Sequence, residues 1–101
     1  MTTICNGHRY DSRQTTTIAE QEHRSHSGNY AGTTSLELAK DGMLLLLTVS
    51  NGQDLYLTDS FRAITRDEAL SWLDGLDLTD EEATACADAG LITLDTDTSP
   101  P

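Results

Sequence analysis

The sequence is poor in positive charge. Six Lys or Arg residues stand against seventeen Asp or Glu, which gives a formal net charge of −11 at pH 7. Solubility alone requires a net charge with a magnitude of only about 2–8 in a small domain. Charge of this sign disfavours binding to nucleic acid or to an anionic membrane and favours basic partners. We therefore expect the partner to be a basic protein surface, with no nucleic acid and no membrane bound.

Long apolar stretches are also missing. The longest apolar run, Met43 to Leu47, has five residues, whereas a membrane-spanning helix needs about 20. The first ten residues, MTTICNGHRY, lack the basic flank and the apolar stretch of a secretory signal. These features predict a cytoplasmic protein, in which Cys5 and Cys86 are free thiols rather than a disulfide.

The chain carries no catalytic signature. It has no nucleophile elbow, phosphate-binding loop, dinucleotide fingerprint or HExxH motif. With 101 residues, 37% of them hydrophobic, it has room for one modest core and little room for a deep pocket. Carboxylates without an apolar pocket to raise the pKa of one of them form a solvated surface more often than an acid–base pair. We therefore predict no enzyme activity and no cofactor.

Four side chains have the spacing of metal ligands. They form a C-x2-H pair and an H-x2-H pair from Cys5, His8, His23 and His26, and zinc binds these atoms. A pair of histidines at this spacing is uncommon in structural zinc sites, however, and the usual cysteine pair is absent. We predict no metal site here; a small zinc-binding structural or regulatory module is an alternative interpretation.

Strand patterns fill the first 64 residues. Alternating or β-branched runs, separated by the turn sequences Lys40-Asp41-Gly42 and Asn51-Gly52, predict an antiparallel meander. The predicted strands are Leu36–Ala39, Met43–Ser50 and Asp54–Thr58, joined by an earlier strand near Thr15–Ala19. The polar, glycine-containing segment 22–32 is predicted to be a surface loop.

The pattern becomes helical after residue 64. Thr65 to Glu68 and Thr79 to Glu82 both have the form of a capping box, and Gly75 and Gly90 stand where helices would end. This predicts helices over about 66–74 and 80–89, then a short strand over 91–94. The predicted fold is an α+β domain over 1–94, with the two helices packed on one face of the sheet. We expect Trp72 and Leu73 to anchor them against Leu44, Leu46 and Tyr56, and 95–101 to form a disordered acidic tail.

Negative charge is concentrated in the C-terminal third. Residues 66–101 contain ten acids and one base, whereas residues 1–65 contain seven acids and five bases. Acids in a first helical turn each gain about 0.3–1 kcal/mol from the helix dipole, but acids at a helix C-terminus do not. A basic partner would account for the remainder. The predicted partner-binding residues are Asp67, Glu68, Asp74, Asp77, Asp80, Glu81, Glu82 and Asp88.

Three segments resemble a widespread family of small bacterial and phage proteins. GHRYDSRQTTTIAE, SLELAKDGMLLLL and ITRDEALSWLD occur in the order of that family's motifs, G-x-x-Y-D-T-x-T-A-x-x-I-A, L-Y-x-T-K-x-G-x-x-F-L and I-x-P-L-T-x-E-E-A-x-x-W. The best matches are Tyr10-Asp11, Gly42, Thr65, Glu68-Ala69 and Trp72. The resemblance implies a β-meander followed by a helix. It implies no catalytic residue, because most members are of unknown function and travel with phages and plasmids.

Small acidic proteins of such mobile elements resemble, as a type, the anti-CRISPR proteins that mimic DNA. A Cas complex holds DNA with Lys and Arg side chains and reads the short PAM duplex through them. This resemblance predicts an inhibitor in the bacterial cytoplasm that occupies the basic DNA- and PAM-binding surface of a Cas effector or Cascade subunit. The alternative is a mobile-element accessory protein of unknown role, whose acidity serves only its solvation.

Overall fold

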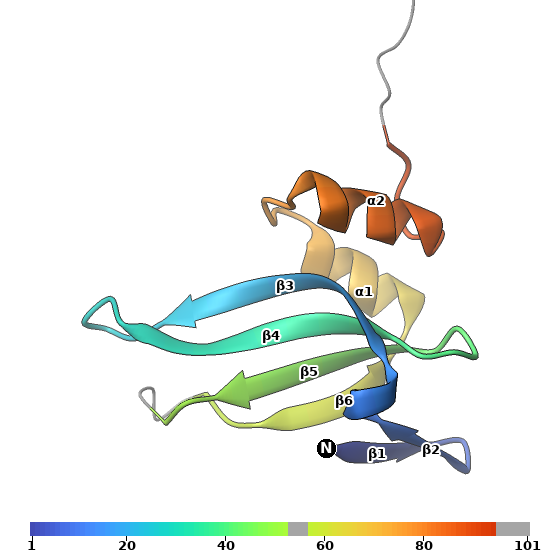
Figure 1. Ribbon diagram of the computed structural model, residues 1–101, viewed down its shortest axis with the longest axis horizontal. Helices are drawn as coiled ribbons and strands as arrows, with labels where there is room; N and C mark the ends of the chain where they lie inside the picture. Colours follow the sequence, from blue (N-terminus) through green and yellow to red (C-terminus); the bar gives the residue numbers. More distant parts are fainter. Residues whose placement is uncertain (53–56, 95–101) are drawn as a thin grey trace, which may run out of the picture.

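The computed structural model describes residues 1–52 and 57–94 (Figure 1). Six strands and a 3-10 turn precede two helices in the described part of the chain. They are β1 (Thr2–Cys5), β2 (His8–Asp11), η1 (Ser12–Gln14), β3 (Thr16–Arg24), β4 (Tyr30–Leu38), β5 (Leu44–Ser50), β6 (Ser60–Ile64), α1 (Arg66–Leu73) and α2 (Asp80–Asp88). The predicted acidic tail, 95–101, lies outside the described residues.

The strands form two antiparallel sheets. The larger has four strands in the order β3-β4-β5-β6, so each strand pairs with its neighbour in the sequence. The smaller is the β1–β2 hairpin, and in Figure 1 it lies at the opposite end of the view from the helices. The predicted α+β fold, an antiparallel meander followed by two helices, is confirmed.

The leucine run of β5 packs into two hydrophobic clusters. Leu44 and Leu46 border the cluster beneath the helices, whereas Leu45 and Leu47 belong to the cluster that contains Tyr10 of the hairpin. Successive side chains of a strand point to opposite faces, so both faces of β5 are covered. This double burial explains why four consecutive leucines occur in a chain with few apolar residues.

The helices pack on the sheet through the first cluster. Ala69 and Leu73 of α1, and Cys86 of α2, are buried there with Ile18 and Leu36 of the sheet. Trp72 is half-buried against the same cluster, as are Leu44 and Leu46, which agrees with the predicted anchoring. Tyr56, the other predicted contact, lies outside the described residues.

The predicted loop over 22–32 is wrong at both ends. β3 continues to Arg24 and β4 begins at Tyr30, so the connection is limited to 25–29, closed by a hydrogen bond from Ser25 N–H to the Asn29 carbonyl at 2.7 Å. The predicted strands near Thr15–Ala19 and over Leu36–Ala39 are correspondingly too short. Polar side chains made these strand ends resemble a loop, but cross-strand backbone pairing satisfies their main-chain groups.

Two further strand predictions need correction. The partner of β5 is Ser60–Ile64 rather than Asp54–Thr58; 53–56 lie outside the described residues, and 57–59 are not in a strand. The strand predicted over 91–94 does not form. Instead, Leu91 donates its N–H to the Cys86 carbonyl at 3.0 Å and buries its side chain beneath α2, which is how a helix ending in a left-handed glycine is closed.

Candidate functional site

The eight predicted carboxylates lie on α1, on α2 and on the connection between them. Asp67 and Glu68 are in the first turn of α1, and three others are in the first turn of α2. Asp74 is the C-cap of α1, Asp77 follows it in the connection, and Asp88 is the last residue of α2.

Both predicted capping boxes form. Thr65 Oγ1 accepts a hydrogen bond from Glu68 N–H at 3.1 Å, and Glu68 Oε1 accepts one from Thr65 N–H at 3.2 Å. Thr79 and Glu82 repeat this exchange at 3.1 and 2.9 Å. The capping boxes hold the carboxylates of Glu68 and Glu82 close to the start of each helix, so these two side chains are less free to face a partner than the other six.

Glu68 is also neutralised within the chain. Its second carboxylate oxygen accepts a hydrogen bond from Arg62 of β6 at 3.0 Å. This hydrogen bond is the largest cause of the lowered pKa of Glu68, and the hydrogen bond from the Thr65 backbone adds to it. Glu68 is therefore charged at neutral pH, but its charge is already compensated.

Glu82 joins α2 to the edge of the sheet. Its Oε2 accepts a hydrogen bond at 2.8 Å from the backbone N–H of Glu20 in β3, an edge strand of the four-stranded sheet. Burial raises the pKa of Glu82, but the hydrogen bonds from the backbone N–H groups of Thr79 and Glu20 outweigh it, so the net pKa is lowered. Glu82 thus stays ionised and positions α2, a contact that sequence reasoning missed.

The other six carboxylates are exposed, and none makes a hydrogen bond or ion pair with any residue in the described part of the chain. They are Asp67, Asp74, Asp77, Asp80, Glu81 and Asp88.

The structure does not gather the six into one cluster. Asp80, Glu81 and Asp88 line a single open depression along α2, together with Thr84 and Ala85. Asp74 lines a different depression, beside Leu70 and Leu78. Asp67 lines a third, with Arg62 and Trp72. The face of α2 therefore carries the densest uncompensated charge.

The four side chains with metal-ligand spacing lie in different elements. Cys5 and His8 are cross-strand neighbours in the β1–β2 hairpin. His23 is in β3, where its Nε2 lies 2.7 Å from Thr34 Oγ1, and His26 is in the turn that follows. Within 1–52 and 57–94, no three His, Cys, Asp or Glu side chains are grouped closely enough to hold a metal ion. Cys5 and Cys86 are free thiols.

No helix in the described ranges is long and apolar enough to cross a membrane.

Comparisons with protein-family models, with curated proteins and with solved structures gave no match. The resemblance to the phage- and plasmid-borne family therefore stays a prediction.

Proposed function

We propose that this protein is a non-enzymatic inhibitor, an acidic mimic of DNA that docks on the basic DNA-binding surface of a Cas surveillance complex in the cytoplasm of a bacterial host. The partner would be a Cas effector or a Cascade subunit. The observation that carries the proposal is the set of six exposed carboxylates on the helical layer that have no partner among the described residues.

The charge on α2 has the density of one DNA strand. Asp80 and Asp88 are eight residues apart, which corresponds to about 12 Å along a helix axis. One strand of B-DNA carries a phosphate every ~3.4 Å along its axis, or about three to four over that length. The depression on α2 is lined by three carboxylates, Asp80, Glu81 and Asp88. This favours imitation of a single phosphate backbone rather than of both strands of a duplex.

The proposal also separates contact residues from supporting ones. Glu68 and Glu82 are occupied by Arg62 and by the Glu20 backbone, so their charges are not available to the same extent. We expect the partner's Lys and Arg side chains to pair mainly with the carboxylates on α2, with Asp74 and Asp77 contributing at the edge. Exposed pairs of this kind contribute about 0.2–1 kcal/mol each, so affinity would come from their number.

The test is a competition assay with a matched control. A panel of purified Cas effector and Cascade complexes, loaded with guide RNA, is incubated with labelled target DNA and increasing amounts of protein. We expect wild-type protein to displace DNA from one of them, less strongly as salt shortens the Debye length below ~8 Å. The double variant Glu81→Lys, Asp88→Lys should lose this activity.

The control is a single charge reversal, Glu22→Lys, which changes the net charge as much as Glu81→Lys does but lies on β3. Glu22 forms only an exposed pair with Arg24, so its loss should leave the fold intact. If Glu22→Lys and Glu81→Lys inhibit equally, the face of α2 is not the contact surface. If wild-type protein does not reduce DNA binding by any of the complexes, the Cas-inhibitor proposal is wrong.

A further inference from the structure

A cavity of about 270 Å³ is lined by residues that belong to neither helix. Its walls come from three segments: strand β2, the stretch around η1, and the turn between β4 and β5. The lining residues are His8, Arg9, Tyr10, Asp11, Gln14, Thr15, Ala39, Lys40 and Asp41. This volume is near the lower limit of pockets that hold small ligands, about 300–1,000 Å³.

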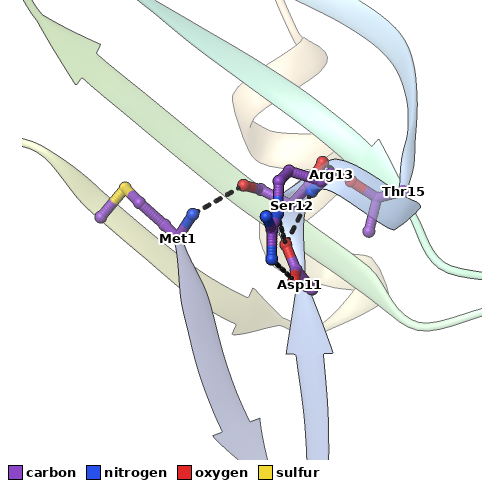
Figure 2. A network of polar contacts seen from close by, with 5 residues as sticks. All are labelled: Met1, Asp11, Ser12, Arg13 and Thr15. Atoms are coloured by element: carbon purple, nitrogen blue, oxygen red, sulfur yellow. Dashed lines mark hydrogen bonds and ion pairs between the residues drawn. The ribbon is translucent and has the colours of Figure 1, made fainter.

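The acidic groups of this cavity are held by the protein itself. Asp11, only 8% exposed, accepts hydrogen bonds from the Arg13 backbone N–H and from two nitrogens of its guanidinium group, at 2.8–3.1 Å (Figure 2). Asp41 accepts one from Tyr10 Oη at 2.9 Å and one from Met43 N–H at 3.0 Å. Both carboxylates therefore have partners on each oxygen.

A third acid contacts a residue of the cavity wall and also has a partner on each carboxylate oxygen. Glu37 is 2% exposed and accepts hydrogen bonds from the hydroxyl groups of Thr15, at 2.7 Å, and Thr17, at 2.6 Å. Thr15 itself lines the cavity. The acids around the cavity therefore build and stiffen it rather than offer it free acceptors.

Two of the basic groups around the cavity have no such partners. Arg9 and Lys40 are among the lining residues, and their side chains make no hydrogen bond or ion pair with any described residue. Arg13 is paired with Asp11, which lines the cavity (Figure 2). Half of the six Lys and Arg residues of a chain with net charge −11 are thus found around one cavity. A guanidinium offers five N–H donors and an ammonium three, and neither can accept, so these unpaired groups are suited to pairing with an anionic ligand.

We propose that this cavity binds a small organic anion, a carboxylate or phosphate carried on a planar ring, with Lys40 contacting the anionic group and the ring lying against His8 and Tyr10.

The ring part of the proposal rests on the cavity wall. The rings of His8 and Tyr10 lie 4.5 Å apart between centroids, tilted at 53°. Tyr10 is buried, and its hydroxyl is fixed by Asp41, so its ring has a set position. Aromatic rings prefer offset or tilted contacts with centroids about 4.5–7 Å apart, and such a wall suits a flat, apolar ligand body.

Nuclear magnetic resonance titration of the full chain tests the proposal. The probes are benzoate, phenyl phosphate and the uncharged benzamide, followed by the backbone amide shifts. We expect saturable shifts at His8, Lys40 and Asp41 with at least one of the two anions and none with benzamide. Comparison of benzoate with phenyl phosphate shows which anionic group the cavity prefers. Equal shifts with benzamide, or no saturation with either anion, would overturn the proposal.

Lys40→Ala is the diagnostic variant, because Lys40 is exposed and its loss leaves no buried group without a partner. It should weaken binding of the preferred anion by about fivefold, the upper end of what one exposed ion pair contributes. Arg24→Ala is the matched control, since it removes an exposed cation at the opposite end of β3 from the strand end that borders the cavity. Equal weakening by both variants would mean that only net charge matters, and the site would be rejected.

Discussion

The contact between Glu82 and β3 provides the sharpest test of how the helical layer is held. In the Glu82→Ala variant, the backbone N–H groups of Thr79 and Glu20 lose an ionised acceptor. A hydrogen bond to a charged group contributes about 1.5–3 kcal/mol when it is well shielded. Since Glu82 is only half-buried, we expect the two together to contribute about 2–3 kcal/mol to the free energy of unfolding.

The adjacent residue is the control. Glu81 is in the same first turn of α2 but is exposed and has no partner in the described part of the chain. Both substitutions remove one favourable charge from the helix N-terminus, so the helix-dipole contribution is lost equally. The difference between Glu82→Ala and Glu81→Ala therefore isolates the two hydrogen bonds, and Glu81→Ala alone should lower stability by only about 0.3–1 kcal/mol.

Urea denaturation and thermal melting measure the difference. A loss of 1 kcal/mol shifts the Tm of a domain of this size by about 4–8 °C, so Glu82→Ala should melt about 10–20 °C below wild type. Glu82→Gln keeps an uncharged acceptor and should lie between the two. If Glu82→Ala and Glu81→Ala melt together, the contact with β3 does not stabilise the fold.

The same contact predicts a pH dependence. The pKa of Glu82 is lowered in the folded protein, because the hydrogen bonds from Thr79 and Glu20 outweigh the effect of burial. Because the pKa of Glu82 is lower in the folded than in the unfolded protein, its contribution to the free energy of unfolding is fully present above the ordinary glutamate pKa. This contribution is lost as the pH falls from there through the pKa of the folded state. The stability gap between wild type and Glu82→Ala should therefore narrow in acid and stay constant near neutrality.

Two other predictions concern buried positions. Cys86 has no exposed surface, and its burial, with a smaller contribution from Glu82, raises the pKa of its thiol. In native protein at pH 8, a thiol reagent should therefore modify Cys5 quickly and Cys86 only after denaturation. Rapid reaction of both cysteines would contradict the packing. A Cβ on Gly32 would lie 2.7 Å from Leu57 Cδ2 and closer still to the Val49 carbonyl oxygen. Gly32→Ala should cost about 1–3 kcal/mol of unfolding free energy in urea, and an unchanged midpoint would refute this.

The helices were the part of the fold that local sequence could predict. Each begins with a capping box whose two hydrogen bonds join residues three apart, and α2 ends at a glycine, Gly90, with a φ of +78°. Every contact in these signals lies within a few residues along the chain, so the sequence alone contains it.

The strands show where local signals stop being sufficient. Asn6-Gly7, which was not singled out, forms the two-residue turn of the β1–β2 hairpin, with φ values of +53° and +80°. Asn51-Gly52, read as the same signal, does not join adjacent strand ends, because β6 begins only at Ser60. An Asn-Gly dipeptide permits a tight turn, but the register that buries Phe61 and Ile64 decides which turn is used.

The candidate site, like the fold, could be predicted from the sequence only in part. Composition identifies the acids, and the capping boxes place Glu68 and Glu82, but their contacts with Arg62 and the Glu20 backbone have no local signal. The bond to Glu20 spans 62 residues and ends on a main-chain N–H, which any residue except proline could supply. The cavity was missed for a related reason: β2, η1 and the β4–β5 turn meet only in the folded chain.

These contacts change how loss-of-function variants should be interpreted. A variant of Glu82 that no longer binds a partner would not identify Glu82 as a contact, because the same change removes a hydrogen bond that positions α2 on β3. Asp80, Glu81 and Asp88 have no such intramolecular role in the described structure, so a loss of binding with an unchanged melting temperature can be assigned to the partner surface. The decisive comparison is therefore between binding and stability in the same variant: a contact residue changes only the first, whereas a positioning residue changes both.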